Sequence, residues 1–434
     1  MHFNLFQQSD IPEKYRSNFT NLYLDIAWFG VLSGTAVNFL NVYATRLGAT
    51  GLQIGLLTAM SAAVNLFLAI PAGHWISKRH TGHAVFWSSI VFRIGYLLWI
   101  PLPWLFNPQG QIWALIVLTF LMAIPLTPLG VGFNALFAEA VPERFRAQVA
   151  GTRNVTFAIA FMLTSLIAGA ILKNVAFPQG YQIIFAIGAF GAAMSSYHIY
   201  HVKPLQDEAI PPLPSHPQPF DHTHKVPVLF REGKPDPSAL GQSPRGMAAI
   251  LRLDIWKTHF KNVLLALFFF HLVHYLSSPL YPLYNVRVLN LNDGHLGNGT
   301  AFYYLTVLIA STQLRRVVQK YGHKKVTGLG VAGMAAYPIM LAFAQNVWHY
   351  YALSFLGGFL FAMVHGAYAN YMLENIPPDD RPAHLAWYII IFNLAVLVSS
   401  IMGPLIADVI GLVSALIIFG LLRIVAGFVL LKWG

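Results

Sequence analysis

Glu139-Ala-Val-Pro142-Glu-Arg-Phe-Arg146 is followed, 235 positions later, by Glu374-Asn-Ile-Pro377-Pro-Asp-Asp-Arg381, so that a glutamate, a proline and an arginine recur at matching places. In each copy an apolar, small-residue-rich stretch that contains an asparagine leads into the glutamate, and a second apolar stretch follows the arginine. The sequence therefore contains two copies of one pattern, in which a charged loop lies between two apolar stretches long enough to cross a membrane.

The surrounding chain follows the same repeat loosely. Gly55 and Gly297 lie 242 positions apart, and Gly82 and Gly322 lie 240 apart. Weak similarity between two long hydrophobic halves is typical of duplicated transporter folds, in which two bundles move about a shared site. The repeat thus favours transport as the function.

The composition is that of a membrane protein. Hydrophobic residues make up 56% of the 434 and charged residues only 10%, whereas soluble domains average about 25% charged residues. Because a helix needs about 20 apolar residues to cross a bilayer, we expect an all-helical protein with twelve spans in two groups of six. Their approximate limits are 22–46, 51–76, 84–106, 112–138, 149–173, 178–202, 262–287, 296–317, 325–345, 347–373, 384–409 and 411–432.

The net charge of +11 comes from basic residues that gather on one side of the predicted membrane spans. If the N-terminus is cytoplasmic, the cytoplasmic segments hold 21 of the 27 Lys and Arg. The external loops hold only Arg46, Lys173 and Arg287, and the other three, Arg93, Arg153 and Arg423, lie within spans. This is the positive-inside pattern. We therefore expect both termini in the cytoplasm, contact with anionic membrane lipids and no nucleic-acid partner. The polar N-terminal residues lack the core of a signal peptide, so we expect the first span to be retained.

A polar stretch rich in Pro, His and Ser divides the chain into an N-terminal bundle (1–202), a linker (203–261) and a C-terminal bundle (262–434). Residues 246–261 place Ile255 and Trp256 among basic residues, which predicts an amphipathic helix on the cytoplasmic face. The chain has no cysteine, which excludes disulfides and thiolate metal sites. We expect no metal and no cofactor.

Twelve spans as six plus six, cytoplasmic termini, a long central loop and basic loops after spans two and eight resemble the major facilitator superfamily. The loop after span two keeps Gly73, Lys78, Arg79 and Gly82 of the family pattern but has Ser77 at its acidic position. The second copy has Gln319 there. In the family that carboxylate helps to latch the cytoplasmic ends of the two halves, so here the latch lacks it.

The repeated block resembles the family's loops after spans four and ten, which suggests another latch. We expect acid–base contacts between the two halves to close a cytoplasmic gate in the outward-open state, and the alternative is that these loop charges are solvated separately. The predicted gate residues are Lys78, Arg79, Glu139, Arg146, Arg153, Glu374 and Arg381.

The resemblance also implies that spans one, four, seven and ten line a central cavity. Polar groups within spans are costly unless they face a partner or water, and the predicted cavity residues are Asn38, Asn41, Asn134, His271, His274, Tyr275, His365, Asn370 and Asn393. His271 and His274, three residues apart, are expected to share a helix face. The alternative to a cavity role is an interhelical hydrogen bond, and it applies to Asn38, Asn65 and Asn393.

Three further residues are candidates for coupling. Asp25 in the first span resembles acidic residues of proton-driven family members, and His271 has an ordinary pKa suited to proton coupling. Arg93 would favour an anionic substrate if it pointed inward. Because family geometry puts spans three and twelve on the outside, Arg93 and Arg423 are expected to snorkel or to pair with backbone carbonyls.

These features predict a secondary or facilitative transporter, expected to be a monomer, that moves a small amphipathic organic solute across the cytoplasmic, or inner, membrane by alternating access. Symport and antiport both stay open, as does a role for protons. The alternative is a non-transporting member of the same fold that acts as a sensor or assembly factor. No catalytic constellation is recognisable, so we do not expect an enzyme.

Overall fold

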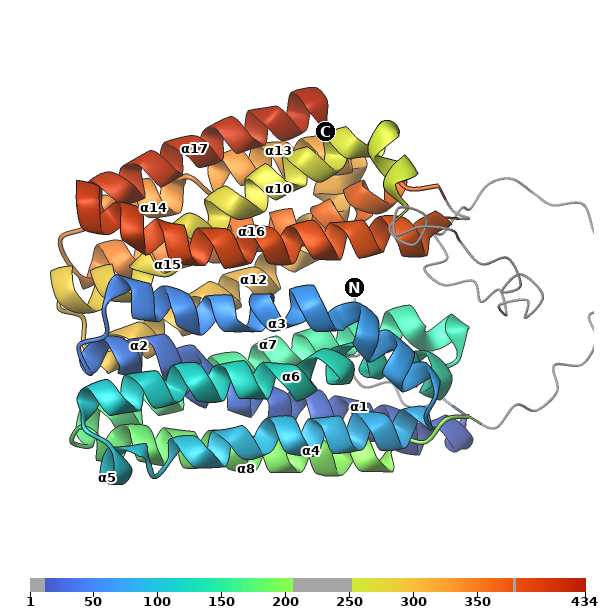
Figure 1. Ribbon diagram of the computed structural model, residues 1–434, viewed down its shortest axis with the longest axis horizontal. Helices are drawn as coiled ribbons and strands as arrows, with labels where there is room; N and C mark the ends of the chain where they lie inside the picture. Colours follow the sequence, from blue (N-terminus) through green and yellow to red (C-terminus); the bar gives the residue numbers. More distant parts are fainter. Residues whose placement is uncertain (1–11, 206–251, 378–379) are drawn as a thin grey trace, which may run out of the picture.

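The computed structural model describes residues 12–205, 252–377 and 380–434, which are helical apart from short loops. The two halves of the chain form two bundles that lie side by side (Figure 1). The N-terminal bundle comprises α1 (Glu13–Leu32), the π-helix η2 (Ser33–Val37), α2 (Asn38–Arg46), α3 (Gly51–Ser77), α4 (Thr81–Trp99), α5 (Leu102–Leu105), α6 (Pro108–Ala140), α7 (Glu143–Asn174) and α8 (Gln179–His201).

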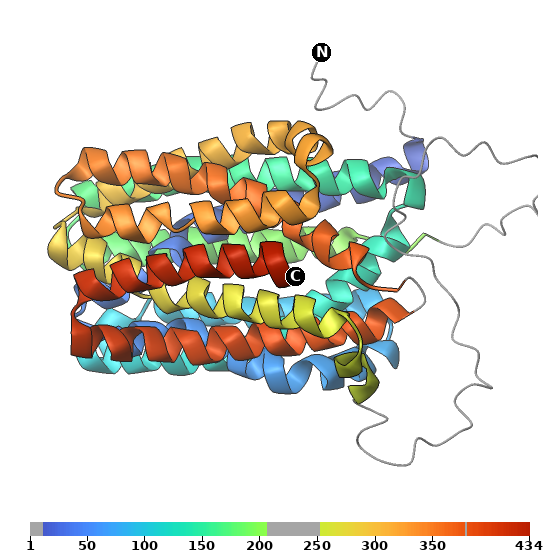
Figure 2. The same ribbon diagram turned by 90° about the horizontal axis from the view of Figure 1, so that it is seen from above.

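The C-terminal bundle repeats this plan. It comprises the 3-10 helix η4 (Leu253–Lys257), α10 (Phe260–Ser277), α11 (Leu280–Leu283), the π-helix η5 (Tyr284–Val288), α12 (Asp293–Tyr321), α13 (His323–Gly333), α14 (Ala336–Ala342), α15 (Val347–Glu374), α16 (Arg381–Ile410) and α17 (Leu412–Trp433). The helices of both bundles run between the same two ends of the molecule (Figure 2). We call the end with residues 47–50 and 289–292 the Arg46 end, and the end with residues 203–205 and 252 the linker end.

The predicted spans correspond to these helices, with local breaks. Ten helical segments of the described residues are long and apolar enough to cross a membrane. The more polar α4 and α12 pack within the same bundles, against α6 and α15 respectively. The third span is shorter than predicted because the helix ends at Trp99 before Pro101, and the ninth is divided between α13 and α14.

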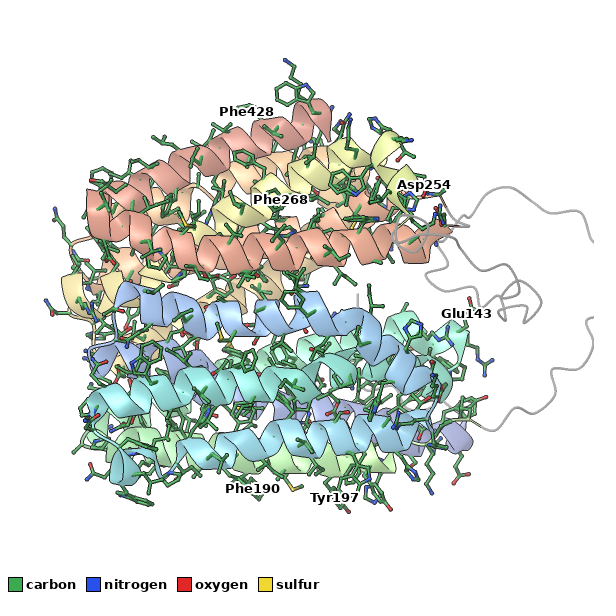
Figure 3. The ribbon with its side chains drawn as sticks, viewed as in Figure 1. Glu143, Phe190, Tyr197, Asp254, Phe268 and Phe428 are labelled. Atoms are coloured by element: carbon green, nitrogen blue, oxygen red, sulfur yellow. The ribbon has the colours of Figure 1, made fainter. Side chains whose placement is uncertain are left out.

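Large apolar side chains cover the outer faces of the bundles, as a lipid environment requires. Phe190 on α8 and Phe428 on α17 are 58% and 60% exposed and point away from their bundles (Figure 3). The charged residues Glu143 and Asp254 lie at the linker end in the same view. This distribution is that of an integral membrane protein.

The predicted amphipathic helix over 246–261 is not continuous. Residues 246–251 lie outside the described residues, and 253–257 form the short helix η4. The chain then extends at Thr258, whose hydroxyl bonds back to the Ile255 carbonyl at 2.7 Å, before α10 begins at Phe260. Ile255 is buried in the C-terminal bundle, so this segment packs as an entry turn.

Two glycines let the bundles approach each other. The bundles pack through α3 against α16 and through α7 against α12. A Cβ on Gly55 of α3 would collide with the carbonyl oxygen of Ser400 on α16, and a Cβ on Gly297 of α12 would lie 2.6 Å from the carbonyl oxygen of Ser165 on α7. Small residues permit such close helix crossings.

The internal repeat relates these two crossings. Gly55 and Gly297 are 242 positions apart, and Ser165 and Ser400 are 235 apart, which is also the interval between the repeated glutamates. Further toward the middle of the molecule, the rings of Phe161 on α7 and Tyr304 on α12 stack at 4.2 Å between centroids. The interface between the bundles is thus built twice from one pattern.

Replacing Gly55 with leucine should separate the bundles near the Arg46 end. In an Asn38→Cys/Thr300→Cys background, whose native side chains lie 3.4 Å apart across the interface, Gly55→Leu should lower the yield of oxidative cross-linking about ten-fold, since a clash of one to two kcal/mol shifts a two-state population by that factor. Gly73→Leu on the same helix is the matched control, because a Cβ there meets open space. Equal yields in the two variants would contradict this role.

Candidate functional site

The Arg46 end is held closed by arginines from both bundles. The Nε and Nη2 atoms of Arg46 on α2 lie 3.2 and 3.0 Å from Asp293 Oδ1 on α12. Arg46 also donates to the Leu291 carbonyl, and Arg287 of η5 donates to the Ala49 carbonyl. Arg46 and Arg287 are 241 positions apart and Ala49 and Leu291 are 242 apart, so the repeat generates both arginine–carbonyl contacts.

At the linker end, the repeated glutamates bond within their own bundles. Glu139 accepts a hydrogen bond from Thr81 Oγ1 at 2.9 Å, and Glu374 Oε1 lies 2.6 Å from His323 Nδ1. Each glutamate ends a long helix and contacts the start of the helix that follows the basic loop of its own half. Arg146 likewise donates to the Val141 and Ala138 carbonyls of its own half.

The other predicted gate residues do not form one cluster. Lys78 caps α3, and Arg79 lies 4.3 Å over the Trp75 ring of the same helix. Arg381 begins α16. Arg153 lies apart from these loop residues, buried beside Asp25. The predicted gate would therefore have to assemble in a conformation other than this one, and it stays a prediction.

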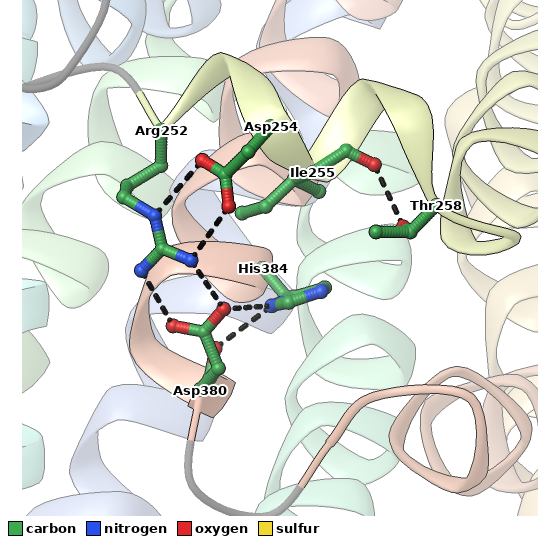
Figure 4. A network of polar contacts seen from close by, with 6 residues as sticks. All are labelled: Arg252, Asp254, Ile255, Thr258, Asp380 and His384. Atoms are coloured by element: carbon green, nitrogen blue, oxygen red, sulfur yellow. Dashed lines mark hydrogen bonds and ion pairs between the residues drawn. The ribbon is translucent and has the colours of Figure 1, made fainter.

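A network of charges holds the described end of the linker against α16 (Figure 4). The Arg252 guanidinium bridges Asp254 and Asp380, with Nη2 at 2.9 and 2.8 Å from their Oδ2 atoms. Asp380 Oδ2 also lies 3.4 Å from Nδ1 of the buried His384. The hydrogen bonds to Arg252 lower the pKa of Asp254, and those to both carboxylates raise the pKa of Arg252. This network positions the first turn of α16.

Asp25 lies in a buried charge cluster within the N-terminal bundle. Its Oδ2 is 3.1 Å from Arg153 Nη2, and its Oδ1 is 3.9 Å from Arg93 Nη2 and accepts a hydrogen bond from Ser195. Arg93 also donates to Ser196 Oγ at 2.7 Å. All three charged residues are at most 8% exposed. One carboxylate thus serves two guanidinium groups from α4 and α7.

This cluster corrects the expectation for Arg93. We expected snorkelling or pairing with carbonyls because its span was placed on the outside, but Arg93 faces inward to Asp25 and α8. Arg423 does pair with backbone carbonyls as expected, those of Met334 and His274, and it is buried at 1% exposure. Coupling through Asp25 or Arg93 stays a prediction.

Imidazole and aromatic groups gather between α10, α15 and α16. His271 Nε2 lies 3.1 Å from the Tyr388 hydroxyl, and its ring is 4.8 Å from that of Phe392, which Tyr275 also contacts. His365 stacks on Phe361 at 3.9 Å between centroids. His271, Tyr275 and His365 of the predicted cavity therefore belong to one neighbourhood, where Tyr388 and Phe392 were not foreseen.

His274 lies one turn of α10 from His271 and has a further set of neighbours. It lines a cavity of about 220 Å³ with Arg423 and three tyrosines, whereas His271 contacts α16. A step of three residues places the two side chains about 60° apart around the helix axis, and both rings contact Phe270. A shared role of the two histidines in a substrate cavity stays a prediction.

The predicted asparagines have different environments. Asn38 lies 3.4 Å from Thr300 of the other bundle, and Asn65 accepts a hydrogen bond from Thr127 at 2.7 Å between α3 and α6. These are the interhelical contacts that we gave as the alternative. The remaining asparagines are half-buried Asn41, buried Asn393, which donates to the Ile389 carbonyl one turn earlier on α16, and exposed Asn134 and Asn370. Their role in a substrate cavity stays a prediction.

Sequence reasoning missed Asp293 and treated Arg46 and Arg287 only as external loop charges. A signal was available, because both arginines follow the first span of a half and obey the spacing of the repeat. It also missed that Asp25 pairs with arginines from spans three and five, since no sequence pattern names the partners of a buried charge.

Replacing Asp25 with asparagine should strongly destabilise the protein. Both buried guanidinium groups would lose their counter-ion, and an uncompensated buried charge costs about 3–5 kcal/mol. Thermal unfolding of the purified protein should therefore begin well below that of the wild type, while Glu143→Gln, at an exposed position, should unfold like the wild type. An unchanged Asp25→Asn melting curve would show that the cluster is not structural.

Comparison with known proteins agrees with this architecture. The model of the Major Facilitator Superfamily matches residues 26–295 and 263–434. The cis,cis-muconate transport protein of Acinetobacter baylyi is 21% identical over 277 residues, which are 61% of this chain and 58% of that relative's length. The chain therefore matches little more than half of this curated relative.

Solved structures with the same fold cover nearly the whole chain. The D-xylose–proton symporter aligns with a TM-score of 0.66 at 16% identity over 96% of this chain and 97% of its own. The nucleoside transporter NupG aligns with a TM-score of 0.64 at 12% identity over 96% of this chain and 98% of its own. Together with the family match over both halves, these likenesses show that the chain is a membrane protein of the Major Facilitator Superfamily.

Proposed function

We propose that this protein is a secondary transporter that moves a small organic solute across the cytoplasmic membrane by alternating access. The observation that carries the proposal is the contrast between the two ends. Repeat-related arginines cross from bundle to bundle at the Arg46 end, while Glu139 and Glu374 bond within their own bundles at the linker end. This is the arrangement expected of a transporter closed at one end.

The distribution of Lys and Arg supports an orientation in which the linker end faces the cytoplasm and the Arg46 end faces outward. Opening the Arg46 end requires breaking the Arg46–Asp293 pair and separating the two glycine crossings. The repeated acidic and basic residues of the linker end, Glu139 and Arg146 with Glu374 and Arg381, would then approach each other and close the cytoplasmic gate.

The solute would bind near the middle of the bundles, beside His271, Tyr275 and His365. These imidazole and aromatic groups suit an amphipathic organic solute. Proton coupling through these histidines or Asp25 is part of the proposal, and the fold likeness to a proton symporter is compatible with it. The proteins similar to this chain are a cis,cis-muconate transport protein, a D-xylose–proton symporter and a nucleoside transporter, so cis,cis-muconate, D-xylose and a nucleoside form a suitable first panel.

Locking the Arg46 end should stop transport. In proteoliposomes that contain an Arg46→Cys/Asp293→Cys variant, oxidation should abolish uptake of the panel compound that the reduced protein carries, and reduction should restore it. The chain has no native cysteine, so no other disulfide can form within one molecule, and cross-linked dimers are separated on a non-reducing gel. Unchanged uptake after complete cross-linking would contradict alternating access.

A matched control separates the lock from the loss of the ion pair. Arg46→Gln/Asp293→Asn removes the same charges without a disulfide, and its uptake should not respond to the oxidant. If uptake occurs in neither redox state for any compound, while the cross-link forms with full yield, the non-transporting alternative gains support.

A further inference from the structure

Arg423 on α17 is a buried cation whose partners among the described residues are all neutral. Its Nη1 donates to the Met334 carbonyl at 3.1 Å, and its Nη2 contacts the His274 carbonyl, Ser277 Oγ and the Tyr281 hydroxyl. Its Nε is buried without a hydrogen-bond partner in the described residues. Among those residues, no Asp or Glu oxygen lies within ion-pair distance of the guanidinium.

The buried arginines of the N-terminal bundle differ from Arg423 because they have an acidic partner. Arg93 and Arg153 share Asp25 inside the N-terminal bundle, so two cations have one internal counter-ion. Within the part of the chain that the structure describes, Arg423 has none, although at 1% exposure it is the most buried of the three. An isolated charge in a low-dielectric interior is strongly unfavourable unless an opposite charge compensates it. This contrast points to a counter-ion that arrives from outside the chain.

Space for such a counter-ion exists beside Arg423. The cavity of about 220 Å³ lies within the C-terminal bundle and is lined by Arg423, His274 and the rings of Tyr281, Tyr303, Tyr337 and Phe361. His274 Nδ1 is also buried without a hydrogen-bond partner among the described residues. Cavities for drug-sized ligands measure about 300–1,000 Å³, so this one suits a smaller molecule.

We propose that this cavity binds the carboxylate of a small aromatic or apolar organic acid, with Arg423 as its counter-ion. The guanidinium offers the carboxylate charge-assisted hydrogen bonds, His274 is placed to contribute another polar contact, and the surrounding rings pack against the apolar part of the acid. A hydrated inorganic ion would leave these rings without a partner. The cavity adjoins the His271 neighbourhood through Phe361, which stacks on His365, and binding there does not depend on transport.

Equilibrium binding of radiolabelled benzoate to the purified full-length protein tests the site. The wild type should bind benzoate saturably, and its uncharged isostere benzamide should compete poorly. Arg423→Gln should weaken benzoate binding about ten-fold or more, as expected for loss of a charge-assisted hydrogen-bonding partner. Arg316→Gln, which removes an exposed arginine of α12, should bind benzoate like the wild type.

A second variant covers the case in which Arg423→Gln does not fold. Leu360→Trp keeps the guanidinium but fills the cavity that Leu360 lines, and it should also abolish benzoate binding. Equal affinity for benzoate and benzamide, equal competition by chloride, or full benzoate binding in Leu360→Trp would each overturn the proposal. Because no uptake is measured, these outcomes are distinct from a failure of the transport assay.

Discussion

The close approach of the bundles at Gly55 and Gly297 is the constraint on which the rest of this structure depends. At each glycine, a helix of one bundle lies against a serine carbonyl of the other, with no room for a β-carbon. The two crossings bring the tips of α2 and η5 to the opposite bundle. Only then can Arg46 reach Leu291 and Arg287 reach Ala49. The closed end is therefore a consequence of backbone packing, to which the Arg46–Asp293 pair adds a charged contact.

The same constraint explains why the contacts come in pairs. Two bundles derived from one pattern present equivalent surfaces to each other, so a contact that forms once forms a second time about the pseudo-twofold axis. The glycine–carbonyl and arginine–carbonyl contacts both obey this rule. The Arg46–Asp293 ion pair has no described equivalent at Arg287, and the buried charges also differ between halves. Asp25 compensates charge in one bundle, whereas Arg423 faces a cavity in the other. The glycine–carbonyl and arginine–carbonyl contacts between the bundles therefore follow the repeat, whereas the buried charges inside the bundles and the Arg46–Asp293 pair do not.

Much of the fold was predictable from the sequence because lipid imposes simple rules on length and composition. Apolar stretches of sufficient length predicted the helices, and the spacing of Gly55 and Gly297 marked the repeat before its structural reason was known. The breaks at Trp99 and between α13 and α14 were not predicted, because proline and packing interrupt a stretch that remains apolar throughout. In the described part of the predicted helix over 246–261, the chain turns at Thr258 between η4 and α10, which the sequence pattern did not indicate.

The candidate site was less predictable, since it depends on which helix faces meet. The spacing of His271 and His274 suggested one helix face, and both contact Phe270, but only His271 also contacts Tyr388 and only His274 lines the cavity beside Arg423. Arg93 was placed by analogy on an outer span and in fact meets Asp25 inside. No sequence pattern marks Tyr388, Phe392 or Asp293. Their relevance comes from their contacts, the first two with His271 and the third with Arg46. Helix packing supplies this information.

The central claim is that the two ends open and close in opposition. Spin labels at the exposed positions Trp104 and Trp348 report on the Arg46 end, and labels at Glu143 and Lys257 report on the linker end. Double electron–electron resonance should give one distance distribution for each pair, and a transported compound should shift them in opposite directions, one longer and the other shorter. Distributions that both stay fixed, or that lengthen together, would contradict the account.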